Sequence, residues 1–316
     1  MSLTRREMLL SSATAAGAAV ACSGPVVAAE AAVVTKPLSE RVRYCLNAST
    51  VMGQKLPLDQ FVELAAKAGY NGIEPWIRDI EAYRNEGKSL TDLAKRIADL
   101  GLRVESAIGF ANWIVDDDQK RADGIENMKR DMDLVRTLGG THIAAPPAGA
   151  NGGDAPKLDL FVVAERYAAI LKAGDETGVI PQIEVWGPSR NLSRLGEAVF
   201  AAVESGHPSA CVLPDVYHVF RGGSSLNGIG MIAGVAIHNF HFNDYPAEPS
   251  RTEQNDGHRV YPGDGVAPWS GIRESLNRIG FSGSVSLELF NRDYWQQDAL
   301  AVATTGLEKM KAVLAE

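Results

Sequence analysis

The sequence predicts an α/β protein, a (β/α)8 TIM barrel, on three observations. Short apolar or β-branched runs alternate with longer amphipathic segments from residue 41 to the C-terminus, and the alternation occurs eight times. Glycines such as Gly69, Gly101 and Gly178 stand where predicted helices end. No glycine-rich phosphate loop follows a predicted strand, which counts against a doubly wound open sheet. We therefore expect one barrel domain over residues 41–316.

The predicted elements follow from this alternation. Strands are the short apolar runs, and we place them at Arg43–Asn47, Gly72–Pro75, Arg103–Ile108, His142–Ala145, Pro181–Val185, Ala210–Pro214, Ile237–Phe242 and Ser284–Leu289. Helices are the amphipathic segments between them, and we place them at Leu58–Ala68, Thr91–Leu100, Gln119–Leu138, Leu158–Glu176, Leu192–Glu204, Ser225–Ile232, Pro268–Ile279 and Asp298–Leu314. In such a barrel the carboxyl ends of the strands form the active-site face.

The N-terminus reads as a secretory signal. Arg5 and Arg6 precede a short run rich in Ala, Ser and Gly, an order typical of a twin-arginine signal. We expect a signal peptide at residues 1–31, a linker at 32–40 and a periplasmic protein. A lipoprotein anchor at Cys22 is a weaker alternative, because Ala19 stands where such signals usually carry leucine. The apolar run is too short, and too rich in Ala and Gly, for a stable membrane span.

Composition excludes several classes of protein. With 45% hydrophobic and 22% charged residues, the 316-residue chain can bury a large core and is neither disordered nor fibrous. Its net charge of -8 provides no basic field for phosphate backbones, so we do not expect nucleic acid as a partner. The three cysteines, Cys22, Cys45 and Cys211, lack the spacing of a CxxC metal or redox site.

Four consecutive predicted strands, the fifth to the eighth, each carry an ionisable residue at or near the carboxyl end. These residues are Glu184, Asp215, His241 and Glu288. Burying several carboxylates together is unfavourable unless they are paired or bind a cation. Three carboxylates and one imidazole suit Mn²⁺, Mg²⁺, Co²⁺ or Zn²⁺. We therefore expect one divalent cation held by the four side chains; the alternative is a structural network of ion pairs.

Other candidates carry weaker signals. The segment from Asp244 to Pro268 is long for a compact domain, which favours a lid or binding loop, and Asp244 is expected to orient His241 or this loop. Glu74 is expected to contact substrate or a metal-bound water, with a salt bridge at the barrel mouth as the alternative. Trp113 and Trp186 are expected to form an apolar wall against a sugar, with packing beneath a loop as the alternative.

At these residues the sequence resembles the xylose-isomerase-like TIM barrel superfamily, and within it the sugar phosphate isomerases/epimerases and ketose 3-epimerases. The resemblance covers nearly the whole chain after the signal. It rests on Gly69-Tyr70-Asn71-Gly72-Ile73-Glu74, the Glu184 strand, Asp215-x-x-His218, the His241 strand, Arg259-x-x-Pro262-Gly263-x-Gly265 and the Glu288 strand. It implies that Glu184 and Glu288 bind the metal, Mn²⁺ before the others, and also transfer protons on opposite faces of a sugar. It implies that His218 and Arg259 contact substrate oxygens.

The expected reaction is isomerisation or epimerisation of a sugar or keto-sugar, through proton abstraction α to a carbonyl and a metal-stabilised enediolate. The main alternative is a metal-dependent lyase or hydratase that acts on an exported 3-keto-glycoside. An abasic-site endonuclease is disfavoured, because the first three strands end in Asn47, Glu74 and Ile108 rather than in histidines. A non-catalytic sugar-binding protein would not need paired glutamates. The sequence leaves open whether the chain forms a homo-oligomer.

Overall fold

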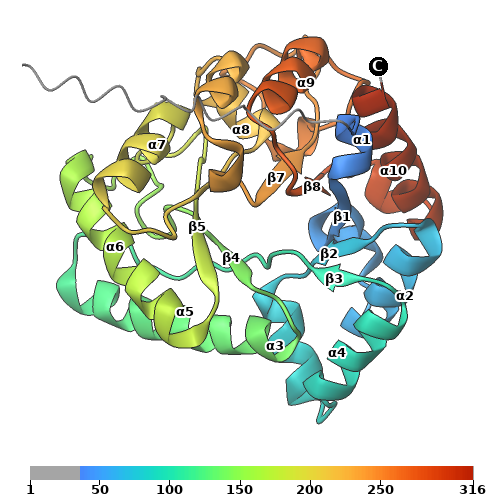
Figure 1. Ribbon diagram of the computed structural model, residues 1–316, viewed down its shortest axis with the longest axis horizontal. Coiled ribbons are helices and arrows are strands. Elements are labelled where there is room, and N and C mark those ends of the chain that lie inside the picture. Colours follow the sequence, from blue (N-terminus) through green and yellow to red (C-terminus); the bar gives the residue numbers. More distant parts are fainter. Residues whose placement is uncertain (1–35, 316) are drawn as a thin grey trace, which may run out of the picture. The chain divides into compact units, whose positions relative to one another are not determined.

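A computed structural model describes residues 36–315 and confirms the barrel. Parallel strands occupy the middle of the molecule and helices surround them (Figure 1). The eight strands of this part of the chain are β1 (Arg43–Asn47), β2 (Gly72–Glu74), β3 (Arg103–Val104), β4 (His142–Ala145), β5 (Ile180–Glu184), β6 (Val212–Leu213), β7 (Asn239–Phe242) and β8 (Ser284–Leu287).

The strands form two parallel sheets that close into one ring. One sheet has the order β3-β2-β1-β8-β7 and the other the order β4-β5-β6. Backbone contacts join them on both sides: Asp215 and His241 form a parallel bridge between β6 and β7, and Ala144 N donates to Ala107 O at 2.9 Å between β4 and the segment after β3. A closed ring brings the carboxyl ends of all strands to one face.

Helices cover the outside of this ring. Those of the described residues are α1 (Leu38–Arg41), α2 (Leu58–Ala68), α3 (Ile77–Asn85), α4 (Leu90–Asp99), α5 (Asp118–Thr137), α6 (Leu160–Thr177), α7 (Leu195–Glu204), α8 (Val216–Arg221), α9 (Trp269–Arg278) and α10 (Ala299–Ala315). Side-chain caps begin several of them; Asp117 accepts from Lys120 N and Asp159 from Phe161 N. Gly69 and Gly178 end α2 and α6 with positive φ, as the sequence predicts.

Strand β7 has one side in the hydrophobic core and the other side facing the interior of the barrel. Successive side chains of a strand point to opposite sides, so Phe240 and Phe242 share one side and Asn239 and His241 the other. Phe242 packs against Trp269 of α9, with ring centroids 5.0 Å apart, in the layer between strands and helices. Asn239 and His241 are fully buried and hydrogen-bond to side chains inside the barrel. The strand's alternation therefore places polar groups inside the barrel.

The structure differs from the sequence prediction in loops and strand lengths. β3 ends at Val104 rather than at Ile108, and a 3-10 helix (Leu226–Met231) replaces the predicted sixth helix. Three helices, α1, α3 and α8, were not predicted. α1 falls largely in the predicted linker, and α3 and α8 each follow a strand end directly within a predicted loop. The predicted signal peptide lies outside the described residues.

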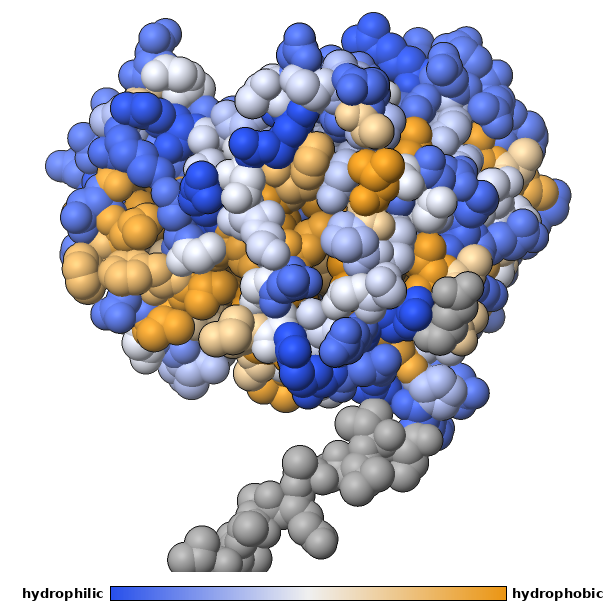
Figure 2. Space-filling view, turned by 90° about the horizontal axis from the view of Figure 1, so that it is seen from above, coloured by the Kyte–Doolittle hydropathy of each residue, from blue (hydrophilic) through white to orange (hydrophobic). Residues whose placement is uncertain are grey.

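The surface of the barrel is mixed in character. Figure 2 shows hydrophilic residues over much of one face and hydrophobic residues in patches among them. Between residues 36 and 315, no helix combines the length and hydrophobicity needed to cross a membrane.

Candidate active site

The predicted ligands meet at the carboxyl ends of the last four strands. Glu184 is the last residue of β5, Asp215 follows β6, His241 lies within β7 and Glu288 follows β8. All four are buried, with exposures between 0 and 4%. Nitrogen and oxygen atoms of Asp215, His241 and Glu288 lie within 4.8 Å of one another, an arrangement that can hold a metal ion. Glu184 lies beside this group rather than in it.

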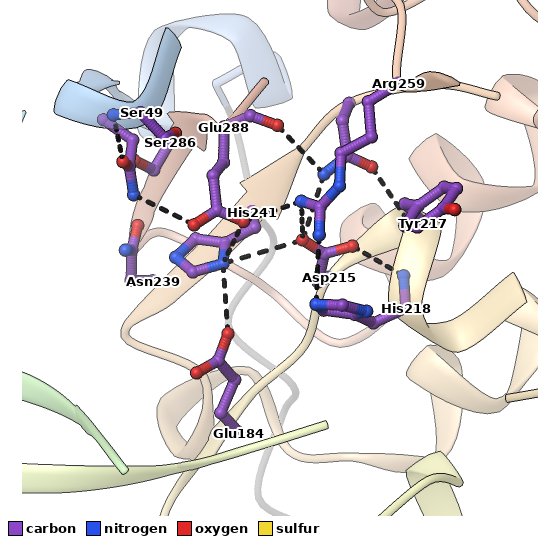
Figure 3. Close-up of polar contacts among 12 residues, drawn as sticks. Ser49, Glu184, Asp215, Tyr217, His218, Asn239, His241, Arg259, Ser286 and Glu288 are labelled. Atoms are coloured by element: carbon purple, nitrogen blue, oxygen red, sulfur yellow. Dashed lines mark hydrogen bonds and ion pairs between the residues drawn. The ribbon is translucent and has the colours of Figure 1, made fainter. Parts of the chain in front are cut away.

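His241 is the centre of the site. Its Nδ1 atom lies 3.3 Å from Glu288 Oε2, 3.7 Å from Asp215 Oδ2 and 3.7 Å from Glu184 Oε1. Figure 3 shows the imidazole between Glu184 and Glu288, which approach it from opposite sides. All three carboxylates thus converge on one ring nitrogen.

The other ring nitrogen fixes the orientation of His241. Its Nε2 lies 3.1 Å from the carboxylate of Glu74, inside the barrel. Glu74 also accepts hydrogen bonds of 2.7–2.8 Å from Asn47, Asn239 and Ser286. Burial by itself would raise the pKa of Glu74, but the charge of His241 and these hydrogen bonds hold it below its ordinary value.

This position corrects the expectation that Glu74 contacts substrate. The Glu74 side chain is fully buried among barrel side chains, and it is not among the residues that line the active-site cavity. Its contact is with the ring of His241, and a carboxylate in this place commonly orients a metal-binding histidine. Glu74 is therefore a positioning residue.

The donor set fits a divalent cation. Nδ1 of His241 is buried and makes no hydrogen bond within the described residues, while Nε2 faces Glu74. Donors that each lie about 2 Å from one ion are roughly 3 to 3.5 Å apart, close to the separations seen here. Burial alone would lower the pKa of His241, but Glu288 and Glu74 raise it well above its ordinary value. A cation would take the place of that proton on Nδ1.

Arg259 joins the carboxylates from the other side. Nη1 donates to Asp215 Oδ2 at 3.0 Å and to Glu288 Oε2 at 2.7 Å, and Nη2 donates to Asp256 at 2.7 Å. His218 Nε2 lies 3.0 Å from Nη2. These contacts hold His218 and Arg259 at the wall of the cavity. Their contact with substrate oxygens stays a prediction.

The long loop after β7 delivers Arg259. Asp244 and Val260 exchange backbone hydrogen bonds of 2.9 and 3.0 Å. The Asp244 carboxylate accepts from Gly263 N, Ala267 N and the indole of Trp269 at 2.7–2.9 Å. Asp244 therefore anchors the loop, one of the two roles expected of it.

Two carboxyl groups of the site differ strongly in their electrostatic surroundings. Burial raises the pKa of Glu184 to about 8, a rise that His241 opposes and that Glu288 and Asp215 support. Burial would also raise the pKa of Asp215, but the charges of Arg259 and His218 hold it far below its ordinary value. Glu184 has no cationic partner other than His241 among the described residues. The surroundings of Glu184 therefore favour its protonated form, and those of Asp215 favour its ionised form.

Aromatic side chains enclose a cavity of about 220 Å³ above these groups. Phe110 connects Trp76 and Trp186 along the wall, with ring centroids 5.1 and 6.1 Å from its own, and Phe290 lies 6.2 Å from Trp76. Glu184, Glu288, His218 and Arg259 also line this cavity. Such a wall suits the C–H faces of a sugar ring.

Trp113 does not form the apolar wall that was expected of it. Its side chain is fully buried, its indole N–H donates to Pro146 O at 2.7 Å, and its ring packs on Tyr167. It supports the loop after β3 and does not line the cavity, whereas the predicted Trp186 does. Phe110, three residues earlier, takes the expected place.

Sequence reasoning missed several residues of the site. Asn47 and Asn239 hold Glu74, Asn243 Nδ2 donates to Asp215 Oδ2 at 3.0 Å, and Asp256 pairs with Arg259. The alternation of β7 could have identified Asn239 and Asn243, which share the side of His241. The place of Asp256 depends on the path of a long loop and had no such signal.

The protein is thus a TIM barrel with a buried cluster of candidate metal ligands at the carboxyl ends of its strands. The chain belongs to the xylose isomerase-like TIM barrel family, whose model matches residues 62–313. It is 24% identical over 276 residues to an inosose isomerase of Bacillus velezensis, a match that covers 87% of this chain and 98% of that protein.

One further relative has a different reaction, and one solved structure has the same fold. A 3-dehydroshikimate dehydratase of Pseudomonas aeruginosa is 25% identical over 264 residues, which cover 80% of this chain and 39% of that protein. The crystal structure of the IOLI protein with a bound zinc atom superposes with a TM-score of 0.80 at 22% identity, covering 87% of this chain and 98% of that one. The relatives support an enzyme of the sugar isomerase/epimerase or dehydratase kind, and the solved structure shows that the chain shares its fold.

Proposed function

We propose that this protein is a metal-dependent isomerase or epimerase of a sugar or keto-sugar, in which Glu184 and Glu288 move the proton. The observation that supports it best is their placement: both line the cavity, and they approach His241 from opposite sides (Figure 3). A substrate held between them presents one face to each carboxyl group. One group can then remove the proton α to a carbonyl while the other returns a proton from the opposite face.

The charges around the two glutamates differ in a way that suits this exchange. Arg259 donates to Glu288 at 2.7 Å and holds this side chain in place, whereas burial raises the pKa of Glu184 to about 8. Glu184 is thus the stronger candidate for the acid that returns the proton, which leaves Glu288 as the base that removes it. A sugar that enters as the other epimer would use them in the reverse order.

Asp215, His241, Glu184 and Glu288 would hold the cation, with Mn²⁺ the first choice and Zn²⁺, Mg²⁺ and Co²⁺ the others. When bound, it supplies a Lewis acid that stabilises the negative charge of the enediolate. His218 and Arg259 would hold substrate oxygens, and the aromatic wall would exclude water from the reacting carbon.

The test is solvent exchange in D₂O, followed by NMR, with a panel of keto-sugars. The wild type should place deuterium at the carbon α to the carbonyl. Glu184→Gln and Glu288→Gln keep an oxygen donor but cannot accept a proton, so turnover should fall by about 10² to 10⁴ while cation binding is partly retained. Glu308→Gln, on the exposed face of α10, is the matched control and should react like the wild type.

The two active-site variants should also differ from each other. With one epimer as substrate, one variant should still exchange the α-proton without completing epimerisation, and the other should block exchange. With the opposite epimer the pattern should reverse. Near wild-type rates in both variants, with metal bound, would show that neither glutamate transfers protons.

A second candidate is a lyase or dehydratase, favoured by the similarity to the 3-dehydroshikimate dehydratase. It would use the same proton abstraction but expel an oxygen from the β-carbon, as from a 3-keto-glycoside. The same NMR experiment separates the two: a retained carbon skeleton with deuterium supports the isomerase or epimerase, and release of the β-substituent supports the lyase.

A further inference from the structure

The active-site cavity has a larger neighbour on the same face of the barrel. A hollow of about 780 Å³ is lined by residues of the β7–α9 loop and of the segment after β8. It shares Asp256 and Phe290 with the cavity that holds the glutamates. Asp256 is itself bound to Arg259, so this outer hollow begins one hydrogen bond away from the guanidinium that contacts Glu288.

The volumes of the two spaces indicate which part of a ligand each could hold. Ligand sites in proteins usually measure about 300 to 1,000 Å³. The inner cavity, at about 220 Å³, falls below that range and suits one small ring, whereas the outer hollow, at about 780 Å³, lies well within it. A ligand that fills both would have a reacting ring inside and a second unit outside.

The lining of the outer hollow suits a polyhydroxylated unit. Trp295 is held in place by donating its indole N–H to Ser49 O at 3.0 Å, which leaves a fixed aromatic surface. Arg292 is exposed and makes no hydrogen bond or ion pair within residues 36–315, so its donors are available. Nδ1 of His258 accepts a hydrogen bond from Asn255 N, at 3.0 Å. An aromatic platform with polar groups around it is how proteins bind sugar rings.

The charges argue against a phosphorylated ligand. Arg259 is the one cationic guanidinium of the inner cavity among the described residues, and Asp215, Glu288 and Asp256 already surround it. The outer hollow is lined by one arginine, Arg292, and by two carboxylates, Asp256 and Asp293. Neither space offers the surplus of positive charge that a phosphate dianion requires.

We propose that the natural substrate is a neutral two-unit sugar, a keto ring in the inner cavity linked to a second sugar or polyol in the outer hollow. This rests on the proposed function, because the inner ring is the one whose α-proton is removed. Binding energy from the second unit would then support the reaction at the first.

The test compares a keto-monosaccharide with a disaccharide that carries the same keto ring. For each we would measure kcat/KM from deuterium incorporation in D₂O, and Kd by calorimetry. The wild type should prefer the disaccharide by about tenfold or more in kcat/KM. Arg292→Ala and Gly257→Trp should bring this ratio toward one. Gly257 lines the hollow; an added Cβ there meets Phe290 O at 3.9 Å and Asn255 Oδ1 at 3.1 Å, and the Asn255 side chain must shift by a few tenths of an ångström to admit it.

Arg103→Ala is the control, because Arg103 is exposed at the start of β3, at the opposite end of the barrel from the site. It should leave the ratio at the wild-type value. A wild-type ratio near one, with exchange from both sugars, would overturn the two-unit substrate while the proposed function stands. A ratio that neither Arg292→Ala nor Gly257→Trp changes would overturn it as well. Tighter disaccharide binding that both variants weaken, without exchange from either sugar, would instead support the hollow and reject the proposed reaction.

Discussion

Glu74 shows how one side chain can control a site that it does not enter. It lies on the Nε2 side of His241, and Nδ1 on the other side faces three carboxylates. Its ionised form fixes which nitrogen of the ring is free for a cation. We therefore expect cation binding by His241 to depend on Glu74, a residue that does not line the cavity.

Replacing Glu74 by Gln tests this dependence. Gln keeps the size of the side chain but removes the charge that holds the Nε2 proton, so cation affinity should fall about 10- to 100-fold. Calorimetric titration with Mn²⁺ and with Zn²⁺ would measure the change. Glu105→Gln is the matched control, since Glu105 is also buried but pairs with Arg43. Equal affinities of Glu74→Gln and wild type would show that His241 needs no such partner.

At this scale the sequence predicted which candidate ligands lie together better than it predicted the residues around them. Glu184, Asp215 and Glu288 come at strand ends and His241 lies within a strand, and the barrel rule brings such positions together. Glu74 also ends a strand, but its inward direction and its contact with His241 across the barrel depend on how the ring closes. Whether an aromatic residue faces the cavity depends on the path of a loop, which is why Phe110 and not Trp113 forms the wall.

The element that most shapes the site is the loop between β7 and α9. Its length marks it as functional in the sequence, but its course does not follow from any repeating pattern. In the structure, the buried carboxylate of Asp244 gathers three donors from the far end of the loop. The loop is therefore an ordered part of the barrel face that holds Arg259 against the carboxylates.

Asp244→Ala should release this loop. The substitution leaves Gly263 N, Ala267 N and the Trp269 indole without their acceptor, and each unsatisfied buried donor costs about 1 to 3 kcal/mol. Urea denaturation should show a loss of roughly 3 kcal/mol or more, and limited proteolysis should cut within residues 245–268. Asp298→Ala, which removes a single exposed helix cap to Ala301 N, is the control and should cost about 1 kcal/mol. A loss no larger than that of the control would mean that other contacts hold the loop.

The order of strands and helices, unlike the course of this loop, could be predicted from the sequence. A parallel strand buried on both faces is a short apolar run, and each helix carries one apolar stripe, so both leave periodic signals in the sequence. The six-residue helix α8 is too short to leave such a signal, whereas α3, with Ile77 and Ile80 buried on one side, carries a signal that the prediction missed. Asp215 begins α8 by accepting a hydrogen bond from His218 N at 2.7 Å, so the same carboxylate caps a helix and faces His241.

At the scale of the whole molecule, the site is buried within a closed barrel. The four candidate ligands are at most 4% exposed. A cation bound there must be acquired when the barrel folds or opens locally, so export of the chain in the folded state would preserve the site. The twin-arginine pathway exports proteins already folded. We propose that the paired Arg5 and Arg6 direct such export, with the barrel closed before the chain crosses the membrane.

Replacing Arg5 and Arg6 together by Lys tests this route. Lys keeps the positive charge but lacks the planar guanidinium group, so a receptor that reads paired arginines should no longer bind, and the protein should remain in the cytoplasm. Fractionation of cells and immunoblotting would measure the periplasmic share. The double variant Arg84→Lys, Arg103→Lys alters two exposed arginines of the barrel and should be exported like the wild type. The retained protein should unfold at the wild-type Tm, because its barrel is unchanged. An undiminished periplasmic share of the Arg5 and Arg6 variant would show that the arginine pair is not read and that the chain reaches the periplasm by another route.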